Sequence, residues 1–190
     1  MSAAIEFPAA GITDGEITLR LLAEADLPAL VKAVQDPEIP RWTRVPSPYG
    51  EDEAREWLGT QARMRDGGEG LDLMIIDRSG ALLGGIGIPR LDQEERSCEL
   101  GYWLASAARG RGVMTRAVRL LVGWILENLP IDRIAILVAP ENVPSRRVAE
   151  RAGFTFEGIL RSHTIIKDTR RDMCSYSLVR GDLDAALGVV

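Results

Sequence analysis

The chain has 190 residues and a mass of 20.8 kDa, which suits one domain with a sizeable core. Because 46% of the residues are hydrophobic and 27% are charged, the composition excludes an intrinsically disordered protein. The formal charge of −5 disfavours a general nucleic-acid-binding protein, so we expect no nucleic-acid partner.

The sequence also argues against a membrane, disulfide or metal protein. No apolar run reaches transmembrane length and the N-terminus has no signal-peptide pattern, so we expect a cytoplasmic protein with no membrane association. Cys98 and Cys174 each lie in an apolar run, which favours buried free thiols. No His, Cys and Asp residues have metal-ligand spacing, and we expect no metal.

In the first half of the chain, residues 1–15 show no pattern and predict a loose lead-in. The proline-rich stretch 40–49 predicts a connector, in which Trp42 and Tyr49 either cap the core or form the wall of a ligand pocket. The predicted elements around it are strands at 16–21, 71–77 and 81–89 and helices at about 23–36 and 51–65.

The second half continues the alternation of strands and helices. Strands are predicted at 97–104, 132–138, about 154–160 and about 173–180, with a long helix from 113 and a short one ending at 152. No linker, repeat or low-complexity segment interrupts the chain. The sequence therefore predicts a single mixed α/β domain spanning residues 1–190.

Two glycines and two arginines, Arg109-Gly110-Arg111-Gly112, lie where the 97–104 strand gives way to the long helix. The first N–H groups of a helix lack intrahelical partners, and glycines let a ligand approach the backbone, so this loop could cradle a phosphate. It matches neither a P-loop nor a dinucleotide fingerprint, because no Lys follows the glycines and Thr115 stands where a third Gly belongs. An ordinary helix start with solvent-facing arginines is the alternative.

Four motifs in order resemble the RimJ/RimL-type branch of the GNAT N-acetyltransferases. They are 99–104 (Glu-Leu-Gly-Tyr-Trp-Leu), 108–112 (Ala-Arg-Gly-Arg-Gly), 140–147 (Pro-Glu-Asn-Val-Pro-Ser-Arg-Arg), and 153–158 with its Gly-Phe and Glu-Gly pairs. The resemblance implies a mixed sheet of about seven strands that splays in the middle, with acetyl-CoA in the split as cosubstrate.

The same resemblance assigns the cofactor's pyrophosphate to the loop after the 97–104 strand. The residues it implies are Arg109, Gly110, Arg111, Gly112, Val113, Met114 and Thr115. Met114 departs from the family pattern, which has a small residue there. The backbone N–H near Leu104 is the implied donor to the oxyanion that forms when an amine attacks the thioester.

Glu99 is the candidate catalytic base. It shares a strand face with Gly101 and Trp103, and a carboxylate in an apolar strand is costly unless it is paired or functional. The amine acceptor must lose a proton before it attacks, and Glu99 could take that proton directly or through a water. An ion pair with an arginine at the strand end is the alternative. Trp103 is assigned to the acceptor pocket with Trp42 and Tyr49.

Asn142 and Ser145 open the short helix, where both residue types are ordinary helix caps. The resemblance implies instead that Asn142 holds the pantetheine arm and that Ser145 hydrogen bonds to the sulfur of CoA, stabilising the departing thiolate. Some GNAT branches use a Tyr seven residues after this Asn as a general acid. Here that position is Ala149, so that acid is absent.

The acceptor is the part of the reaction that the sequence leaves open. The branch includes enzymes that acetylate protein N-termini, ribosomal ones among them, and enzymes that acetylate small amines or antibiotics. An acyl-CoA-binding regulatory protein without turnover is the alternative from another class. His163 is expected on a partly exposed loop or strand, with a share in the acceptor pocket as the second possibility, and a homodimer stays open.

Overall fold

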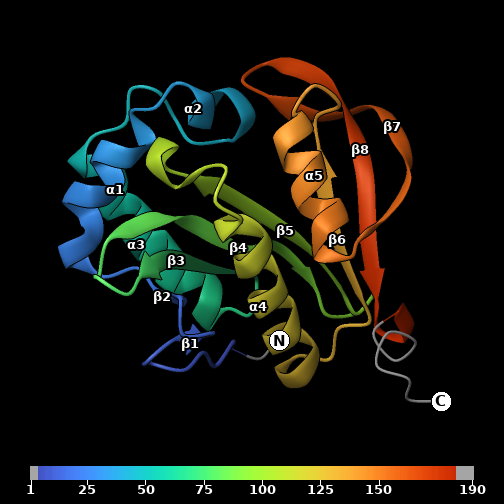
Figure 1. Cartoon of the computed structure of the whole chain (residues 1–190), viewed down its shortest axis with the longest axis horizontal. Coiled ribbons are helices and arrows are strands. Elements are labelled where there is room, and N and C mark those ends of the chain that lie inside the picture. Colours follow the sequence, from blue (N-terminus) through green and yellow to red (C-terminus); the bar gives the residue numbers. More distant parts are fainter. Residues whose placement is uncertain (1–3, 183–190) are drawn as a thin grey trace.

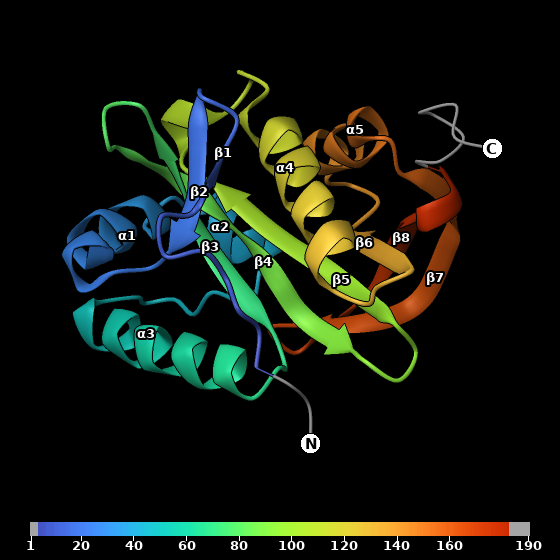
Figure 2. The same cartoon turned by 90° about the horizontal axis from the view of Figure 1, so that it is seen from below.

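The computed structural model describes residues 4–182, in which eight strands form one sheet with helices on both faces (Figures 1 and 2). The strand order is β1-β2-β3-β4-β5-β6-β8-β7, and only β5 and β6 are parallel neighbours. The strands are β1 (Ile12–Thr13), β2 (Ile17–Leu21), β3 (Leu71–Asp77), β4 (Leu82–Asp92), β5 (Ser97–Leu104), β6 (Arg133–Val138), β7 (Thr155–Ile166) and β8 (Thr169–Val179). The helices are α1 (Leu27–Val34), α2 (Glu38–Trp42), α3 (Glu51–Asp66), α4 (Val113–Asn128) and α5 (Val143–Ala152), with 3₁₀ turns at Glu24–Asp26 and Ser106–Ala108.

Two hydrophobic cores lie on opposite faces of the sheet. Strand alternation sends Leu73 and Ile75 of β3 towards α4, while Met74 and Ile76 of the same strand face α1 and α3. The helix α4 has the apolar face that its sequence predicts, with Leu121 and Ile125 fully buried against the sheet. Figure 2 shows α1 and α3 on one side of β2–β5 and α4 on the other. The strands next to the site are therefore covered on both faces.

The sheet splits between β5 and β6, as the sequence predicts. Their parallel ladder joins only Ser97–Leu100 to Arg133–Ile136, and from Gly101 onwards β5 pairs with β4 alone. Beyond Ile136, β6 continues only with β8. Figure 1 shows the two halves of the sheet diverging from this short ladder. The backbone groups that face the gap have no strand partner, so they remain available to a ligand.

An irregularity in β4 lies at the level where the split begins. The β4–β5 register shifts between Gly87 and Arg90, so that Ile88 and Pro89 face Leu100 of β5. Pro89 has no N–H to donate to the ladder, and an extra residue in one strand raises the local twist. We infer that this bulge turns the end of β5 away from β6.

Two sequence-based assignments in the first half of the chain need correction. Residues 1–15 are not a loose lead-in, because β1 lies within them and the N–H of Ile5 donates to the carbonyl of Arg65 at 2.9 Å. The stretch 40–49 is not entirely a connector, because it begins inside α2, which tolerates Pro40 in its first turn. The hydrogen bond from Ile5 to Arg65 joins residues far apart in the sequence, so no local pattern could show it.

The last two strands are longer than predicted. They meet in a tight turn at Lys167-Asp168, where both residues have positive φ angles of 49° and 62°. Two left-handed residues in succession are the signature of a type I′ hairpin turn, which usually contains Asn or Gly. Lys is uncommon in such a turn and neither residue is Gly or Asn, so the turn was not predicted from the sequence.

The cysteine prediction is confirmed, since Cys98 and Cys174 are both buried and free. Across residues 4–182, no helix combines the length and apolar character needed to cross a membrane.

Candidate active site

A cleft of about 870 Å³ opens where β5 and β6 part. The walls of this cleft come from both halves of the sheet, from α3 and α5, and from the loop after α2. The structure brings together here most of the side chains that the sequence singled out: Glu99, Asn142, Ser145, Trp42, Tyr49, Trp103 and His163. The loop 109–115 is not part of this wall and lies just beyond the end of β5.

Glu99 lies at the start of the split, on the last stretch of β5 that pairs with β6. Its side chain is half-buried and borders the cleft, so it is less enclosed than the sequence suggested. Arg90 is its cross-strand neighbour on β4, yet no arginine in residues 4–182 lies within ion-pair distance of Glu99. The carboxylate is thus exposed to the cleft and is not neutralised by a strand-end ion pair.

Tyr102 and Ser145 join the two sides of the cleft. The Tyr102 hydroxyl lies 3.0 Å from Oγ of Ser145 and also donates to the Ser145 carbonyl oxygen at 3.3 Å. Burial raises the pKa of Tyr102 to about 12, an effect that the Ser145 hydrogen bond opposes. At neutral pH the tyrosine therefore keeps its proton and can support a hydrogen bond made by Ser145.

The sequence analysis assigned no role to Tyr102. Strand alternation placed it on the opposite face from Glu99, which was correct. Strand alternation could not show that Tyr102 contacts Ser145 in the first turn of α5, because no local sequence pattern indicates where α5 packs on β5. Tyr102 was nevertheless within the Glu-Leu-Gly-Tyr-Trp-Leu motif that was already singled out.

Asn142 is the N-cap of α5. Its Oδ1 accepts a hydrogen bond from the backbone N–H of Ser145 at 3.3 Å, which satisfies one of the donors at the helix start. The hydroxyl of Ser145 is left free of capping and makes its contact with Tyr102 instead. Ala149 is fully buried, and the position holds no acid.

The glycine loop has the geometry of an open cradle. Gly110 and Gly112 have φ angles of 73° and 76°, a left-handed conformation that glycine adopts without steric cost. Gly112 is the N-cap of α4, and a Cβ atom at Gly110 or Gly112 would meet nothing within 4 Å. The first N–H groups of a 16-residue helix therefore face a space that no side chain of the loop fills.

The arginines beside these glycines have different surroundings. The guanidinium of Arg109 donates to the carbonyl of Leu104 at 2.9 Å and forms an ion pair with Asp36 at 2.8 Å. It therefore braces the loop against the segment after α1, while Arg111 stays exposed. Val113 and Met114 are buried in the core below α4, and Thr115 is half-buried. Donors from this loop are thus mainly backbone groups.

The N–H of Leu104 points into the split. Ala105 donates its N–H to the carbonyl of Leu83 on β4 at 2.9 Å, and hydrogen bonding alternates along an antiparallel ladder. Trp103 therefore directs its backbone groups to β4, whereas Tyr102 and Leu104 direct theirs to the side where β6 has departed. With its carbonyl held by Arg109, Leu104 presents a backbone donor to the gap.

Asp72 is a further carboxylate of the cleft, which Glu53 and Glu56 also line, and no role was predicted for it from the sequence. It lies on β3 opposite Gly87, where a Cβ atom would fall 2.2 Å from Oδ1 of Asp72, so only glycine leaves room for it. Gln61 donates to its Oδ2 at 2.7 Å, and burial raises the pKa of this carboxyl despite that bond. The reasoning applied to Glu99, a carboxylate within an apolar strand, would have found it.

Tyr49 and Trp103 both cap the core and line the cleft, whereas Trp42 lines the cleft. Tyr49 and Trp103 pack against the core below α1 and α3 and also line the cleft. Burial raises the pKa of Tyr49 to about 12. Trp42 donates from Nε1 to Glu38 at 3.0 Å and borders the cleft. His163 is an exposed residue of β7 that lines the cleft, which fits both possibilities raised for it.

Comparison with known proteins places this architecture among the acetyltransferases. The family described as "Acetyltransferase (GNAT) domain" matches residues 16–155. "Putative ribosomal N-acetyltransferase YdaF" of Bacillus subtilis (strain 168) is 32% identical over 86% of this chain and 91% of its own length.

Solved structures show the same fold. The Microcin C7 self immunity acetyltransferase MccE, solved with acetyl-CoA and AMP, superposes with a TM-score of 0.83 at 24% identity, covering 91% of this chain and 98% of its own. RimL, the ribosomal L7/L12 alpha-N-protein acetyltransferase solved with coenzyme A, gives 0.81 at 20% identity, with coverage of 90% and 97%.

Proposed function

This chain belongs to the GNAT acetyltransferase family, and we propose that it transfers an acetyl group from acetyl-CoA to the amine of a protein N-terminus, as on a ribosomal protein. One observation carries the proposal. The split between β5 and β6 brings a carboxylate and a hydroxyl pair to one cleft, and an unpaired backbone donor and an open helix N-terminus follow at the end of β5. The name of the 32% identical relative supports a ribosomal acceptor.

The residues present fit acetyl-CoA, which supplies the activated acetyl thioester. The open cradle at Gly110 and Gly112 suits the pyrophosphate, with Arg109 and Arg111 adding positive charge and Val113, Met114 and Thr115 contributing backbone N–H groups. The unpartnered backbone of β5 beyond Gly101 suits an extended pantetheine arm lying in the place of a strand. Asn142, at the other side of the gap, can face the same arm.

Glu99 acts as the general base in this proposal. An α-amino group has a pKa of roughly 7.7–8.0 and is largely protonated at neutral pH, so it must lose a proton before its lone pair can attack. Glu99 accepts that proton, directly or through a water. Asp72, Glu53 and Glu56 also line the cleft, and this acidic lining attracts the ammonium group before it is deprotonated.

The remaining groups stabilise charge that appears during transfer. As the amine nitrogen bonds to the acetyl carbon, the carbonyl oxygen gains negative charge, and the Leu104 N–H donates to it. When the C–S bond breaks, the electron pair leaves with the CoA sulfur, and the second proton lost by the bonded nitrogen balances the thiolate, so that the products are the amide and the CoA thiol. Ser145 donates to that sulfur, and the Tyr102 hydroxyl, 3.0 Å from Ser145 Oγ, then turns its proton from the Ser145 carbonyl to this oxygen. Much of the rate gain comes from holding the two reactants together.

A thiol-release assay tests the proposal. Acetyl-CoA is incubated with the protein and a panel of N-terminal peptides and small amines, and free CoA thiol is measured. We expect release with peptides and much less with small amines. Release with small amines only would contradict the N-terminal acceptor, and no release with any acceptor would favour an acyl-CoA-binding protein without turnover.

A further inference from the structure

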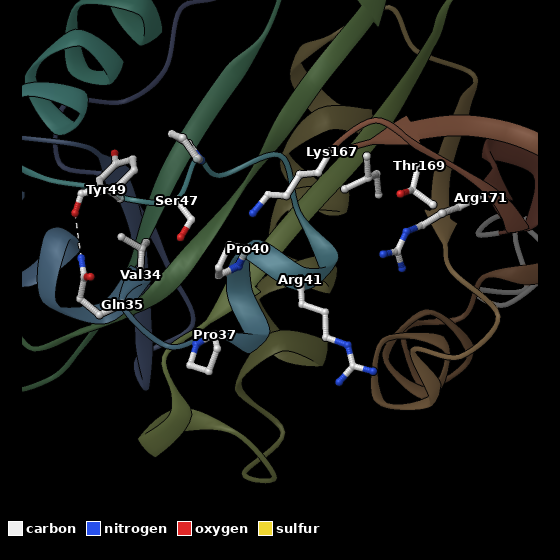
Figure 3. Close-up of a pocket in the computed structure, with 12 residues that line it drawn as sticks. Val34, Gln35, Pro37, Pro40, Arg41, Ser47, Tyr49, Lys167, Thr169 and Arg171 are labelled. Carbon is white, nitrogen blue, oxygen red and sulfur yellow. Dashed lines mark hydrogen bonds between the residues drawn. The ribbon is translucent and has the colours of Figure 1, made fainter.

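A second cavity, of about 330 Å³, lies at the tip of the β7–β8 hairpin, opposite α2 (Figure 3). It adjoins the active-site cleft, because Val34, Pro46, Tyr49 and Ile166 line both spaces. A molecule whose amine lies beside Glu99 could therefore extend from the cleft into this cavity.

The cavity is rich in positive charge. Arg41, Lys167 and Arg171 line it, and none of its lining residues is acidic. Arg41 is paired with Glu38 at 3.0 Å, and its guanidinium points away from Ser47 in Figure 3. Within residues 4–182, no carboxylate lies within ion-pair distance of Lys167 or Arg171. Two cations thus face the cavity without a counter-charge.

Arg171 carries an unsatisfied donor at this place. Its Nε–H is buried and has no hydrogen-bond partner in the part of the chain that the structure describes. Its guanidinium lies 5.7 Å from the Trp42 ring, over which Arg41 also lies at 4.6 Å. A buried donor without an acceptor is costly, and an anion in the cavity would supply the missing acceptor.

The opposite wall offers a further donor. In Figure 3 the Lys167 ammonium points towards Ser47 and Pro40. The Ser47 hydroxyl makes no hydrogen bond to another residue of the described chain, so it can donate to a ligand. An ammonium, a guanidinium and a hydroxyl around one cavity form a site for a carboxylate or phosphate oxygen.

We infer that this cavity binds an anionic group of the acceptor, downstream of its reactive amine. The inference rests on the proposed function, because it assumes that the acceptor amine lies beside Glu99. The preferred acceptor is then a peptide with a free N-terminus followed within a few residues by a carboxylate or phosphate. The acidic residues Glu99 and Asp72 hold the amine end, and the basic cavity holds the anionic end.

Peptide pairs test the inference. Six-residue peptides with a free N-terminal Ser carry Asp, Asn or phosphoserine at each later position in turn. We expect the parental protein to acetylate the best Asp peptide with about tenfold higher kcat/KM than its Asn partner. Comparison of Asp with phosphoserine shows which anion is preferred. A parental protein without preference for either anion would overturn the inference.

Variants then locate the preference. In the double variant Lys167→Gln, Arg171→Gln the preference should fall to about twofold or less, and each single variant should lose part of it. Arg171→Lys, which keeps the charge but not the Nε donor, should retain part of it. The matched controls Lys32→Gln and Arg161→Gln change exposed cations outside both cavities and should retain the preference. Lys167→Gln alters an exposed turn residue, so folding should not obscure the result.

A binding measurement separates this inference from the proposed function. The same peptides are titrated calorimetrically into the protein saturated with CoA, which requires no turnover. If no acceptor is acetylated but the acidic peptides still bind about tenfold more tightly through Lys167 and Arg171, the proposed function fails and the anion site stands. If the double variant keeps the preference, or instead loses affinity for CoA, the cavity is not the anion site of the acceptor.

Discussion

Two carboxylates, one in each half of the split sheet, differ in how many hydrogen-bond partners the protein gives them. Glu157 on β7 accepts two hydrogen bonds from Arg133 and one each from Ser175 and Ser177. Asp72 on β3 has one partner, Gln61. The pKa of Glu157 is lowered to about 2, chiefly by the Arg133 hydrogen bonds, whereas burial raises the pKa of Asp72.

The difference extends to the regions around them. Where β6, β7 and β8 meet around Glu157, polar side chains satisfy one another. Around the cleft and the adjoining cavity, several polar groups have no protein partner among the residues that the structure describes, including Glu99, the Leu104 N–H and the Arg171 Nε. Such groups are available to a ligand, and activity can offset their cost in stability.

The largest effect on ligand binding is expected from a substitution in the glycine loop at Gly110 and Gly112. Gly112→Val adds a side chain in the space above the helix N-terminus and forces a left-handed φ of 76° on a β-branched residue. We expect CoA to bind about a hundredfold more weakly, measured by calorimetry. Gly80→Val is the matched control, since Gly80 also has a positive φ and an open surround but lies in the β3–β4 turn. Equal CoA affinity in both variants would contradict the placement of the pyrophosphate.

The next effect concerns the hydroxyl pair. Ser145→Ala removes the donor to the sulfur, and we expect single-turnover transfer to slow by about thirtyfold with little change in acetyl-CoA affinity. Tyr102→Phe should slow the same step, and the double variant should lose less than the product of the two because both act on one group.

A structural role predicts another outcome. The Ser145 N–H, which Asn142 caps, survives in Ser145→Ala, so melting should be affected little. Asn142→Ala instead should cost about 1 kcal/mol of unfolding free energy. If Ser145→Ala lowers stability by that amount and leaves the transfer rate intact, the hydroxyl has a packing role only.

Asp72→Asn should weaken acceptor binding and at the same time make the protein more stable. We expect the KM for the acceptor to rise about tenfold and the unfolding free energy at pH 7 to increase by about 1 kcal/mol. Because the folded pKa is raised, the parental protein loses stability as pH rises from about 3.8, the usual value, and the variant lacks this slope. Unchanged KM with unchanged stability would contradict the contrast with Glu157.

Glu157→Gln is expected to give the smallest effect, and on stability alone. The ion pair is partly exposed, so we expect a loss of about 1 kcal/mol and no change in KM. A lowered folded pKa stabilises the protein above the usual value of 4.5, and this contribution disappears as pH falls towards about 2. Denaturant melts between pH 6 and pH 2 of both proteins measure it, and a changed KM would place Glu157 in the functional region.

Local pattern was enough to predict most of the fold. The strand at Leu71–Asp77 and the helices that start at Glu51 and Val113 follow from periodicity and capping, because their side chains are sorted by face. The β1 pairing, α2 and the Lys167-Asp168 turn were missed. β1 and α2 have only two and five residues, too few for a clear periodicity, and the turn contains an uncommon turn residue.

The site was predicted less completely, for a related reason. Glu99 and Ser145 were found because they lie in contiguous motifs. Asp72 lies within an apolar strand and could have been identified from the sequence in the same way as Glu99. Tyr102 gains its significance from Ser145 on α5, which only the fold brings close to it. The basic cavity is of the same kind, since its cations come from β8 and the hairpin turn while its hydroxyl comes from the loop after α2.

The central claim is that Glu99 removes the proton from the acceptor amine, and a rate–pH profile of Glu99→Gln tests it most directly. The substitution keeps the shape and removes the basicity, and Glu95→Gln, an exposed carboxylate of the β4–β5 turn, is the control. At pH 7 we expect turnover to fall by about a hundredfold or more, with CoA affinity unchanged and partial recovery above the amine pKa of roughly 8. Parental turnover across the whole pH range, or a loss of CoA binding in its place, would contradict the claim.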